Sequence, residues 1–327
     1  MFGSKVGQFF NFKAAEGLDD DAIKITLATD SVNTIVGMRS GRDLQIFTTG
    51  AEFFIPQGDL DPITPSNVVA KSSTKRGAKA FVRPQAAEGG TLFIQRQGKA
   101  IRELLFSDVE LSYVANNISL LASHLIVDPI KTALRAATDT TEGDLLLILN
   151  GEDSTGYRDS SIPFTGQIAA FMLNKGQNIV APSHLVTDGV FKDVAVDVDI
   201  IYTIVKRTIG GATKFYVEVF DDDFTTDSAT QITTGFSGAT YNSFGNIEGK
   251  SVKIIRDDIV DTDDTVSSSA ITAGGTPLRY LEVGLDYDVE VKTNPVETRL
   301  SSGTISCLLY TSPSPRDLST SRMPSSA

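Results

Sequence analysis

Short apolar runs alternate with polar turns along most of the chain, at the spacing typical of β-strands. Before residue 235 the runs include AIKITLA, NTIVGMRS, LQIFTTG and EFFI, and short polar or glycine-containing turns separate them. Runs rich in β-branched and aromatic residues and bounded by turn residues are typical of strands. We therefore predict a mainly β fold.

Three of the turns are short enough to close β-hairpins. They are GRD at 41–43, QGK between TLFIQR and IRELLF, and Gly210-Gly211 between DIIYTIVKRTI and TKFYVEVF. A two-glycine connection favours a tight hairpin, because glycine accepts the positive φ angles of such turns. DLLLILN, residues 144–150, is a continuous apolar run between turn residues. It predicts a buried strand.

One segment, at about 117–137, departs from the strand pattern. Four of its apolar residues recur at a spacing that places them on one helical face. These are Ile118, Leu121, Leu125 and Ile126. Pro129 would start or break a turn after them. We expect one or two short helices here, inserted in the β body.

A polar stretch near residues 225–245 suggests a boundary between two parts of the chain. It is rich in Thr, Ser, Gly and Asp, as linkers and long loops are. The runs that follow it, NIEGKSVKIIRDDIV, SSSAITAGG and RYLEVGLDYDVEVKTNPVE, are short and closely spaced. We therefore divide the chain into a β body at 1–235 and a small β-barrel at 243–300.

The charge balance is acidic. The 327 residues include 29 Lys and Arg against 41 Asp and Glu, for a net charge of −12. Nucleic-acid-binding patches need clustered basic residues, so this balance argues against one. An acidic surface suits a conduit through which DNA slides without sticking, and it equally suits a surface charged for solubility. The single cysteine is Cys307, so no disulfide forms within the chain.

The densest basic cluster lies in STKRGAKAFVRP. Its charged residues are Lys75, Arg76, Lys79 and Arg83. Small neighbours on either side indicate a long loop. We interpret it as an interface with an acidic neighbouring subunit or with DNA in a channel. A merely solvated loop is the alternative interpretation.

Candidate catalytic and metal-binding patterns are weak. GNIEGKS, residues 245–251, is one residue short of a P-loop, and a β-branched run follows it where a P-loop needs a helix. The acidic clusters lack EF-hand spacing and are interpreted as solvated loops; they are Asp221, Asp222, Asp223 and Asp227, and Asp257, Asp258, Asp261, Asp263 and Asp264. His124 and His184 are the two histidines, and the chain has no Trp. We expect no enzymatic activity, no cofactor and no metal site.

The order of segments between residues 44 and 106 resembles a known family. A strand ending in TTGAEFFI is followed by an ITPSN turn, the polar KSSTKRGAKAFVRP loop and TLFIQRQGKAIRELLF. This order is similar to the tail tubular, or nozzle, proteins of short-tailed bacteriophages, of the tail tubular protein B type, and the similarity runs from about residue 4 to 300. The resemblance implies a propeller-like body at 1–235.

The resemblance also implies partners and a location. Such a protein would form a homo-oligomeric ring with portal, adaptor and other tail proteins, and DNA would pass through it transiently and without sequence specificity. It would be part of the virion, in the phage tail, after assembly in the cytoplasm of the host bacterium. In this family, long loops of the body reach neighbouring subunits or the lumen.

Residues 243–300 resemble a second module, the FCCH-type β domain named after ubiquitin-activating enzymes. The matching residues are Glu248-Gly249-Lys250-Ser251-Val252 and Val283-Gly284-Leu285-Asp286-Tyr287. The resemblance implies a fold, and it does not imply adenylation chemistry, because no nucleotide motif accompanies it.

The last residues carry a different pattern. CLLYTSPSPRD begins at Cys307, and SRMPSSA ends the chain. Both resemble the translation of a transposase adapter used in sequencing libraries. We therefore expect residues 307–327 to be an artefactual disordered tail, with the natural chain cut near Ser306 and begun internally. A natural Ser/Pro-rich tail would have the same composition.

Two hypotheses follow for function. The first is a fragment of a phage nozzle protein whose ring conducts DNA. The alternative is a β-propeller tail protein that binds a receptor or glycan on the host surface. No segment reaches the roughly 18 uninterrupted apolar residues of a membrane-spanning helix, so no membrane span is expected.

Overall fold

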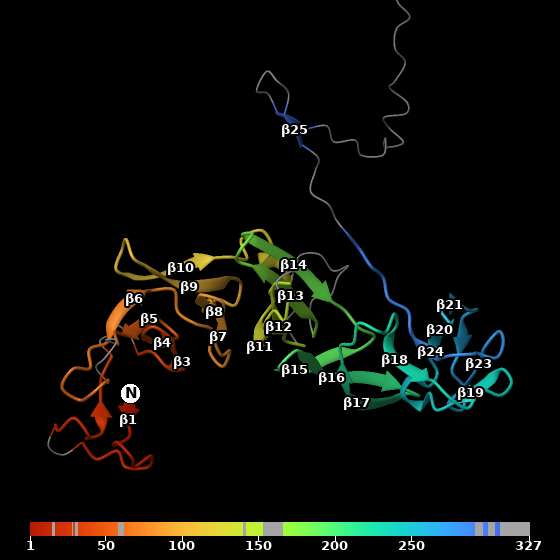
Figure 1. Cartoon of the computed structure of the whole chain (residues 1–327), viewed down its shortest axis with the longest axis horizontal. Helices are drawn as coiled ribbons and strands as arrows, with labels where there is room; N and C mark the ends of the chain where they lie inside the picture. The colour runs from red at the N-terminus through yellow and green to blue at the C-terminus, as the bar shows by residue number, and fades with distance from the viewer. Residues whose placement is uncertain are drawn as a thin grey trace, which may run out of the picture. The chain divides into compact units, whose positions relative to one another are not determined.

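The computed structural model describes residues 1–14, 17–27, 29, 32–57, 62–139, 142–152, 166–291, 297–299 and 305–307 (Figure 1). The chain divides into two compact units, Met1–Asp286 and Tyr287–Ala327. Antiparallel strands dominate the described residues. The mainly β prediction is therefore confirmed.

The first four-stranded sheet is a meander. Its strands are β3 (Ile35–Ser40), β4 (Leu44–Thr48), β5 (Glu52–Ile55) and β6 (Lys71–Thr74), in that order across the sheet. Ser40 faces Leu44 across the GRD turn, so the first expected hairpin is confirmed. A short pair, β1 (Phe2–Gly3) and β2 (Ile23–Lys24), comes before this sheet in the chain.

The second meander repeats the arrangement. It contains β7 (Gln85–Ala87), β8 (Gly90–Ile94), β9 (Ile101–Ser107) and β10 (Ser112–Asn117). Ile94 faces Ile101 across the QGK turn, which confirms the second hairpin. The ring centroids of Phe47 and Phe93 lie 5.2 Å apart within a core that the first two sheets share.

The third meander contains the predicted buried strand. Its strands are β11 (Pro129–Arg135), β12 (Asp144–Asn150), β13 (Ile168–Asn174) and β14 (Ile179–Leu185). β12 coincides with DLLLILN, its residues 146–150 are buried, and it pairs with strands on both sides, which confirms the prediction. Ile148 and Phe171 pack in one core with Leu92 and Ile101 of the second sheet.

The helices expected at about 117–137 are wrong. β10 continues to Asn117, β11 begins at Pro129, and between them lies a single 3-10 turn, Ser123–Leu125. The backbone is held instead by contacts with distant strands: Ile118 N–H donates to Ile101 C=O at 3.1 Å. Leu125 and Ile126 are buried in the core that the second and third meanders share. The apolar residues of this segment therefore belong to a connection between two sheets and not to one face of a helix.

A three-stranded sheet follows. It contains β15 (Val190–Asp197), β16 (Ile200–Ile209) and β17 (Ala212–Val219). Ile209 faces Ala212 across the Gly210-Gly211 turn, which confirms the third hairpin. Both glycines have positive φ, 59° and 78°, as a two-residue hairpin turn of this type requires. The inner face shares a core with the third meander.

The remaining strands of the first unit form a five-stranded sheet and a small pair. The sheet contains β18 (Asp227–Ile232), β24 (Leu281–Leu285), β20 (Ser251–Arg256), β21 (Ile259–Val260) and β22 (Asp264–Thr265). The pair is β19 (Thr240–Asn242) with β23 (Ala270–Thr272), and a 3-10 turn spans Gly245–Ile247. These strands enclose one core that includes Phe244, Ile254 and Val283.

Two sequence interpretations fall in this region. The polar stretch at 225–245 contains β18, which pairs with β24. The two segments that resemble an FCCH-type domain overlap neighbouring strands: Ser251 and Val252 begin β20, and residues 283–285 end β24, which pairs with β20. A closed propeller and a closed barrel stay predictions.

The second unit contributes β25 (Glu297–Arg299) and β26 (Ile305–Cys307), which pair with each other. Cys307 is the last residue of β26, and the rest of the expected adapter-encoded tail, 308–327, lies outside the described residues. Within the part of the chain that the structure describes, no helix is long and apolar enough to cross a membrane.

Candidate interface at the crossover between β6 and β7

The basic cluster lies on a segment that links two sheets. We call residues 75–84, between β6 and β7, the crossover segment. The N–H of Ala78 donates to the carbonyl oxygen of Thr48 at 2.8 Å, and the N–H of Lys79 donates to that of Ile94, also at 2.8 Å. The first bond reaches the end of β4 and the second reaches the end of β8. The loop backbone is therefore fixed between the first and second meanders.

Gly77 allows this close approach. Its φ is +70°, and a Cβ added there would overlap the carbonyl oxygen of Thr49. It would also lie 3.3 Å from Cβ of Arg96. Glycine is the residue that accepts both the positive φ and the absence of space. Arg96 N–H donates to the carbonyl oxygen of Gly77 at 2.8 Å, which fastens the segment to the end of the second sheet.

A buried carboxylate lies beneath the start of the segment. The Glu52 side chain on β5 is fully buried, and its Oε2 accepts bonds from Thr74 Oγ1 at 2.5 Å and from Arg76 N–H at 3.1 Å. Its Oε1 has no hydrogen-bond partner among the described residues. Burial raises the pKa of Glu52 above its ordinary value, although these bonds act in the opposite direction.

The four basic residues of the cluster have different surroundings. The side chains of Lys75, Arg76 and Arg83 are exposed, and that of Lys79 is half-buried. Lys79 Nζ forms an ion pair with Asp128 Oδ1 at 2.7 Å, just before β11. The crossover segment therefore presents three exposed cationic side chains on a fixed backbone, and Lys79 forms an ion pair with Asp128.

The far end of the segment is held by the third meander. Thr132 Oγ1 on β11 donates to the carbonyl oxygen of Arg83 at 2.8 Å. Phe81 is 96% exposed and has a φ of +67°, a conformation that costs free energy for a side chain of this size. An exposed aromatic ring between Lys79 and Arg83 adds an apolar element to the basic surface, and aromatic and arginine side chains are enriched at protein interfaces.

Arg102 belongs to the same surroundings, and the sequence analysis missed it. Burial and the nearby charge of Arg76 lower the pKa of Arg102, while Glu52 acts in the opposite direction. Its Nε donates to Gln95 Oε1 at 2.9 Å. Arg102 lies far along the chain from Arg76, and strand pairing brings them together, so no local sequence signal could have linked them.

The other sequence candidates lie elsewhere. His124 is in the 3-10 turn before β11, and His184 is half-buried in β14. Ser251–Arg256 form a strand after GNIEGKS, as the β-branched run predicted. A P-loop requires a helix at that point to hold phosphate.

The acidic clusters serve as caps for turns. Asp257 accepts bonds from the N–H groups of Leu278 and Arg279 at 2.8 and 2.7 Å, and Asp261 accepts one from Gly274 N–H at 2.6 Å. Asp227 belongs to a different arrangement, an ion pair with Arg207. No group of three or more metal-binding side chains occurs among the described residues.

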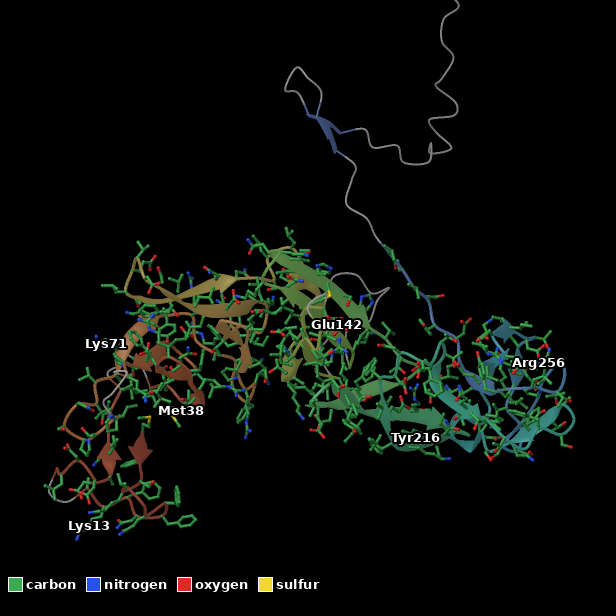
Figure 2. All side chains as sticks on the ribbon, viewed as in Figure 1. Lys13, Met38, Lys71, Glu142, Tyr216 and Arg256 are labelled. Carbon is green, nitrogen blue, oxygen red and sulfur yellow. The ribbon has the colours of Figure 1, made fainter. Side chains whose placement is uncertain are left out.

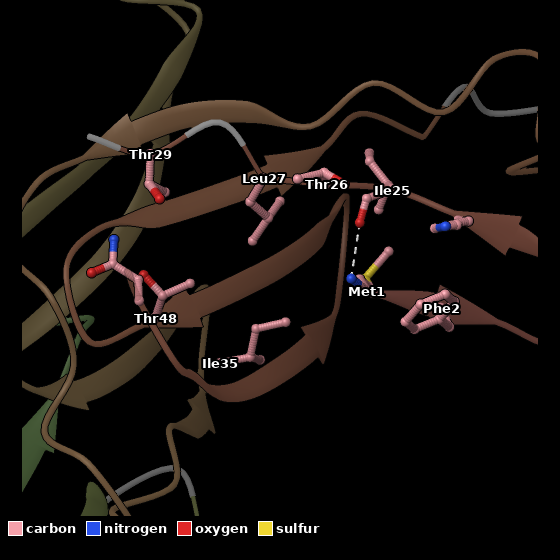
Figure 3. Close-up of a pocket in the computed structure, with 10 residues that line it drawn as sticks. Met1, Phe2, Ile25, Thr26, Leu27, Thr29, Ile35 and Thr48 are labelled. Carbon is pink, nitrogen blue, oxygen red and sulfur yellow. Dashed lines mark hydrogen bonds between the residues drawn. The ribbon is translucent and has the colours of Figure 1, made fainter. Parts of the chain in front are cut away.

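A shallow pocket near the amino terminus offers little chemistry (Figure 3). Phe2, Leu27 and Ile35 supply apolar lining, and Met1 N donates to the carbonyl oxygen of Ile25 at 2.9 Å. Lys24 and the amino group of Met1 are the ionisable groups among the described lining residues. The described lining residues include no carboxylate and no histidine, which are common general acids and bases.

Comparison with known proteins adds no assignment. No protein-family model matches the chain, and no curated protein is significantly similar to it.

Proposed function

We propose that this chain is a structural virion protein, a fragment of a phage tail nozzle protein whose homo-oligomeric ring conducts DNA. In this proposal it is no enzyme, and it works in the phage tail beside the portal and adaptor after assembly in the host cytoplasm. The order of segments at residues 44–106 resembles that of this family and supports the proposal.

The succession of three four-stranded meanders carries the proposal. They follow one another in the chain, and each shares a core with the next. Four-stranded antiparallel sheets in succession are the units of which propellers are built. A scaffold of this kind supports a rigid body with loops at its edges, which is what a ring subunit requires.

The crossover segment supplies the proposed contact between subunits. Its exposed Lys75, Arg76 and Arg83 stand on a chain whose net charge is −12. A basic surface on an acidic protein is complementary to other faces of the same protein, so identical subunits can associate head to tail. Head-to-tail contacts related by rotation close into rings. An acidic bore would repel DNA phosphates and let the duplex slide.

Charge reversal tests this contact. The double variant Arg76→Glu and Arg83→Glu should weaken ring assembly with the portal and adaptor proteins, as seen by electron microscopy. Both side chains are exposed, so the fold should survive, which a thermal melt would show. The matched control reverses two exposed lysines near the amino terminus, Lys13→Glu and Lys24→Glu, and should assemble normally.

Two outcomes would count against these statements, the first against the proposed function and the second against the proposed contact. One is a natural protein that never enters a ring and binds a cell-surface glycan specifically, which would favour the receptor-binding alternative. The other is equal assembly of the charge-reversed variant and the control, which would remove the crossover segment from the interface.

A further inference from the structure

β17 is a long edge strand with an uncovered apolar face. Within the described residues it pairs with β16 and with no second strand. Phe215 is 61% exposed and Val217 is 72% exposed, and they lie on the face opposite to Val205, which is in the core. A row of unpaired backbone groups at a sheet edge is a template for pairing with another chain.

The edge strand of the third meander differs in this respect. β14 carries Pro182, which has no N–H to offer to a further strand. β17 contains no proline, and its sequence, ATKFYVEV, is rich in β-branched and aromatic residues. Its edge therefore keeps the hydrogen-bonding groups that pairing requires.

The hairpin register fixes which backbone groups of β17 point to the open edge. Residues that flank a two-residue turn form a hydrogen-bonded pair, and such pairs alternate with pairs that are not hydrogen-bonded. Ile209 and Ala212 flank the turn. Just after the other end of β17, Phe220 N–H donates to Ile201 C=O at 3.0 Å. Phe220 and Ala212 are both even-numbered, so both ends of the hairpin give the same alternation. The odd-numbered residues of β17 therefore direct their N–H and C=O groups outward.

This alternation restricts how two copies of β17 can pair. Outward groups match when odd-numbered residues face odd-numbered residues across an antiparallel pair. Tyr216, labelled in Figure 2, lies in the middle of β17. The register centred on Tyr216 places Lys214 opposite Glu218 of the second copy and Phe215 opposite Val217. Opposite charges and apolar side chains that face each other across strands stabilise the pair. Centring on Phe215 would instead place Lys214 opposite Tyr216.

The geometry points to a second copy of this chain as the occupant of the β17 edge. Two β17 strands pair antiparallel about a twofold axis at Tyr216 and join two three-stranded sheets into one continuous sheet. At two symmetry-related positions Lys214 adds a second cation beside Glu218, whose carboxylate also accepts two hydrogen bonds from Arg207 of its own chain. This contact is isologous, whereas the contact that closes a ring is heterologous. It goes beyond the function proposed above, and either contact can fail without the other.

Cysteine cross-linking reads the register directly. In the new ladder, even-numbered residues form the pairs without hydrogen bonds, whose Cα atoms lie about 4.5 Å apart, within the range of a disulfide. In a Cys307→Ser background, Tyr216→Cys should form a disulfide-linked dimer on oxidation. Lys214→Cys in the same background should stay monomeric on a non-reducing gel, because it faces Glu218. No cross-linking of Tyr216→Cys, or equal cross-linking of both variants, would overturn the proposal.

Sedimentation velocity on the unmodified sequence gives an independent measurement. The chain should dimerise, and Lys214→Glu should weaken the dimer about tenfold, because it creates two like-charge pairs across the strands. Lys99→Glu is the matched control, with the same charge change at an exposed turn outside β17, and should dimerise normally. A chain that is monomeric at every concentration would overturn the contact, and an unchanged dimer in Lys214→Glu would overturn the register.

Discussion

Arg207 of β16 donates two parallel hydrogen bonds to Glu218 of β17, Nε to Oε1 at 2.9 Å and Nη2 to Oε2 at 2.7 Å. The Arg207 side chain is fully buried, and its Nη1 also donates to the carbonyl oxygen of Asp188 at 2.7 Å. Asp227 of β18 lies 3.3 Å from Nη2. One guanidinium therefore ties the three-stranded sheet to the five-stranded sheet that contains β18.

Replacing this arginine should be costly. Arg207→Met would leave the carboxylates of Glu218 and Asp227 close together without their cation, and we expect a loss of about 3 kcal/mol in the free energy of unfolding. Arg207→Lys should lose less free energy of unfolding than Arg207→Met, because lysine keeps the charge but cannot donate bidentately. Urea denaturation measures both. Arg279→Met, which removes an exposed ion pair with Asp258, should change little; similar losses in both would contradict the assignment.

Gly77 and Gly89 form a matched pair of positions. Both have positive φ, +70° and +72°, but a Cβ at Gly89 would meet nothing within 4 Å, whereas one at Gly77 would overlap the Thr49 carbonyl oxygen. Gly89→Ala should cost about 1 kcal/mol from backbone strain alone. Gly77→Ala should cost about 1–3 kcal/mol more, from the overlap. Thermal unfolding of the two variants compares them, and equal costs would show that the crossover segment can move aside.

Glu52 should make stability depend on pH in an unusual direction. Its pKa in the folded protein is raised above 4.5 by burial, so the folded state holds a proton that the unfolded state releases. Between the two pKa values this group therefore lowers stability as pH rises. Glu52→Gln keeps an acceptor for Thr74 and Arg76 and removes the titration. The variant should gain stability relative to the unmodified chain as pH increases, and a constant difference in urea denaturation across pH would contradict this.

Asp257 should show the opposite dependence. The N–H groups of Leu278, Arg279 and Tyr280 lower its pKa below 3.8, so its contribution to stability is present above that value and is lost as pH falls through the depressed folded pKa. Asp257→Asn should destabilise the turn at neutral pH. The difference from the unmodified chain should shrink in acid, as followed by denaturation at a series of pH values. A difference that grows in acid would refute the role of the carboxylate.

Local patterns predicted the strands and hairpins well, because each depends on residues close in sequence. Gly210-Gly211 supplies the positive φ of its turn, and DLLLILN is a continuous apolar run whose two faces pack in two different cores. The expected helix near residue 121 failed for a non-local reason. Asn150 Nδ2 donates to Leu125 C=O at 2.9 Å, and Asn150 Oδ1 accepts from Val127 N–H at 3.1 Å, so a distant strand satisfies the backbone that a helix would have used.

The candidate interface was predictable only in part. The basic residues of the loop lie close together in sequence, and this density made the loop a candidate; they are Lys75, Arg76, Lys79 and Arg83. The buried Glu52 below Arg76, and Arg102 beside it, depend on strand register over many residues. The ion pair between Lys79 and Asp128 also depends on contacts between distant segments, because Asp128 lies just before β11, in another sheet.

The position of β24 sets an order for synthesis. In the three meanders each strand pairs with a strand next to it in the chain, so each sheet can be completed as soon as its last strand emerges from the ribosome. β24 instead lies between β18 and β20, which precede it by many residues. A nascent chain stalled before Leu281 would hold finished meanders beside two strands that lack the partner between them. Chaperone dependence should therefore be greatest after β20 has been made and before β24 is complete.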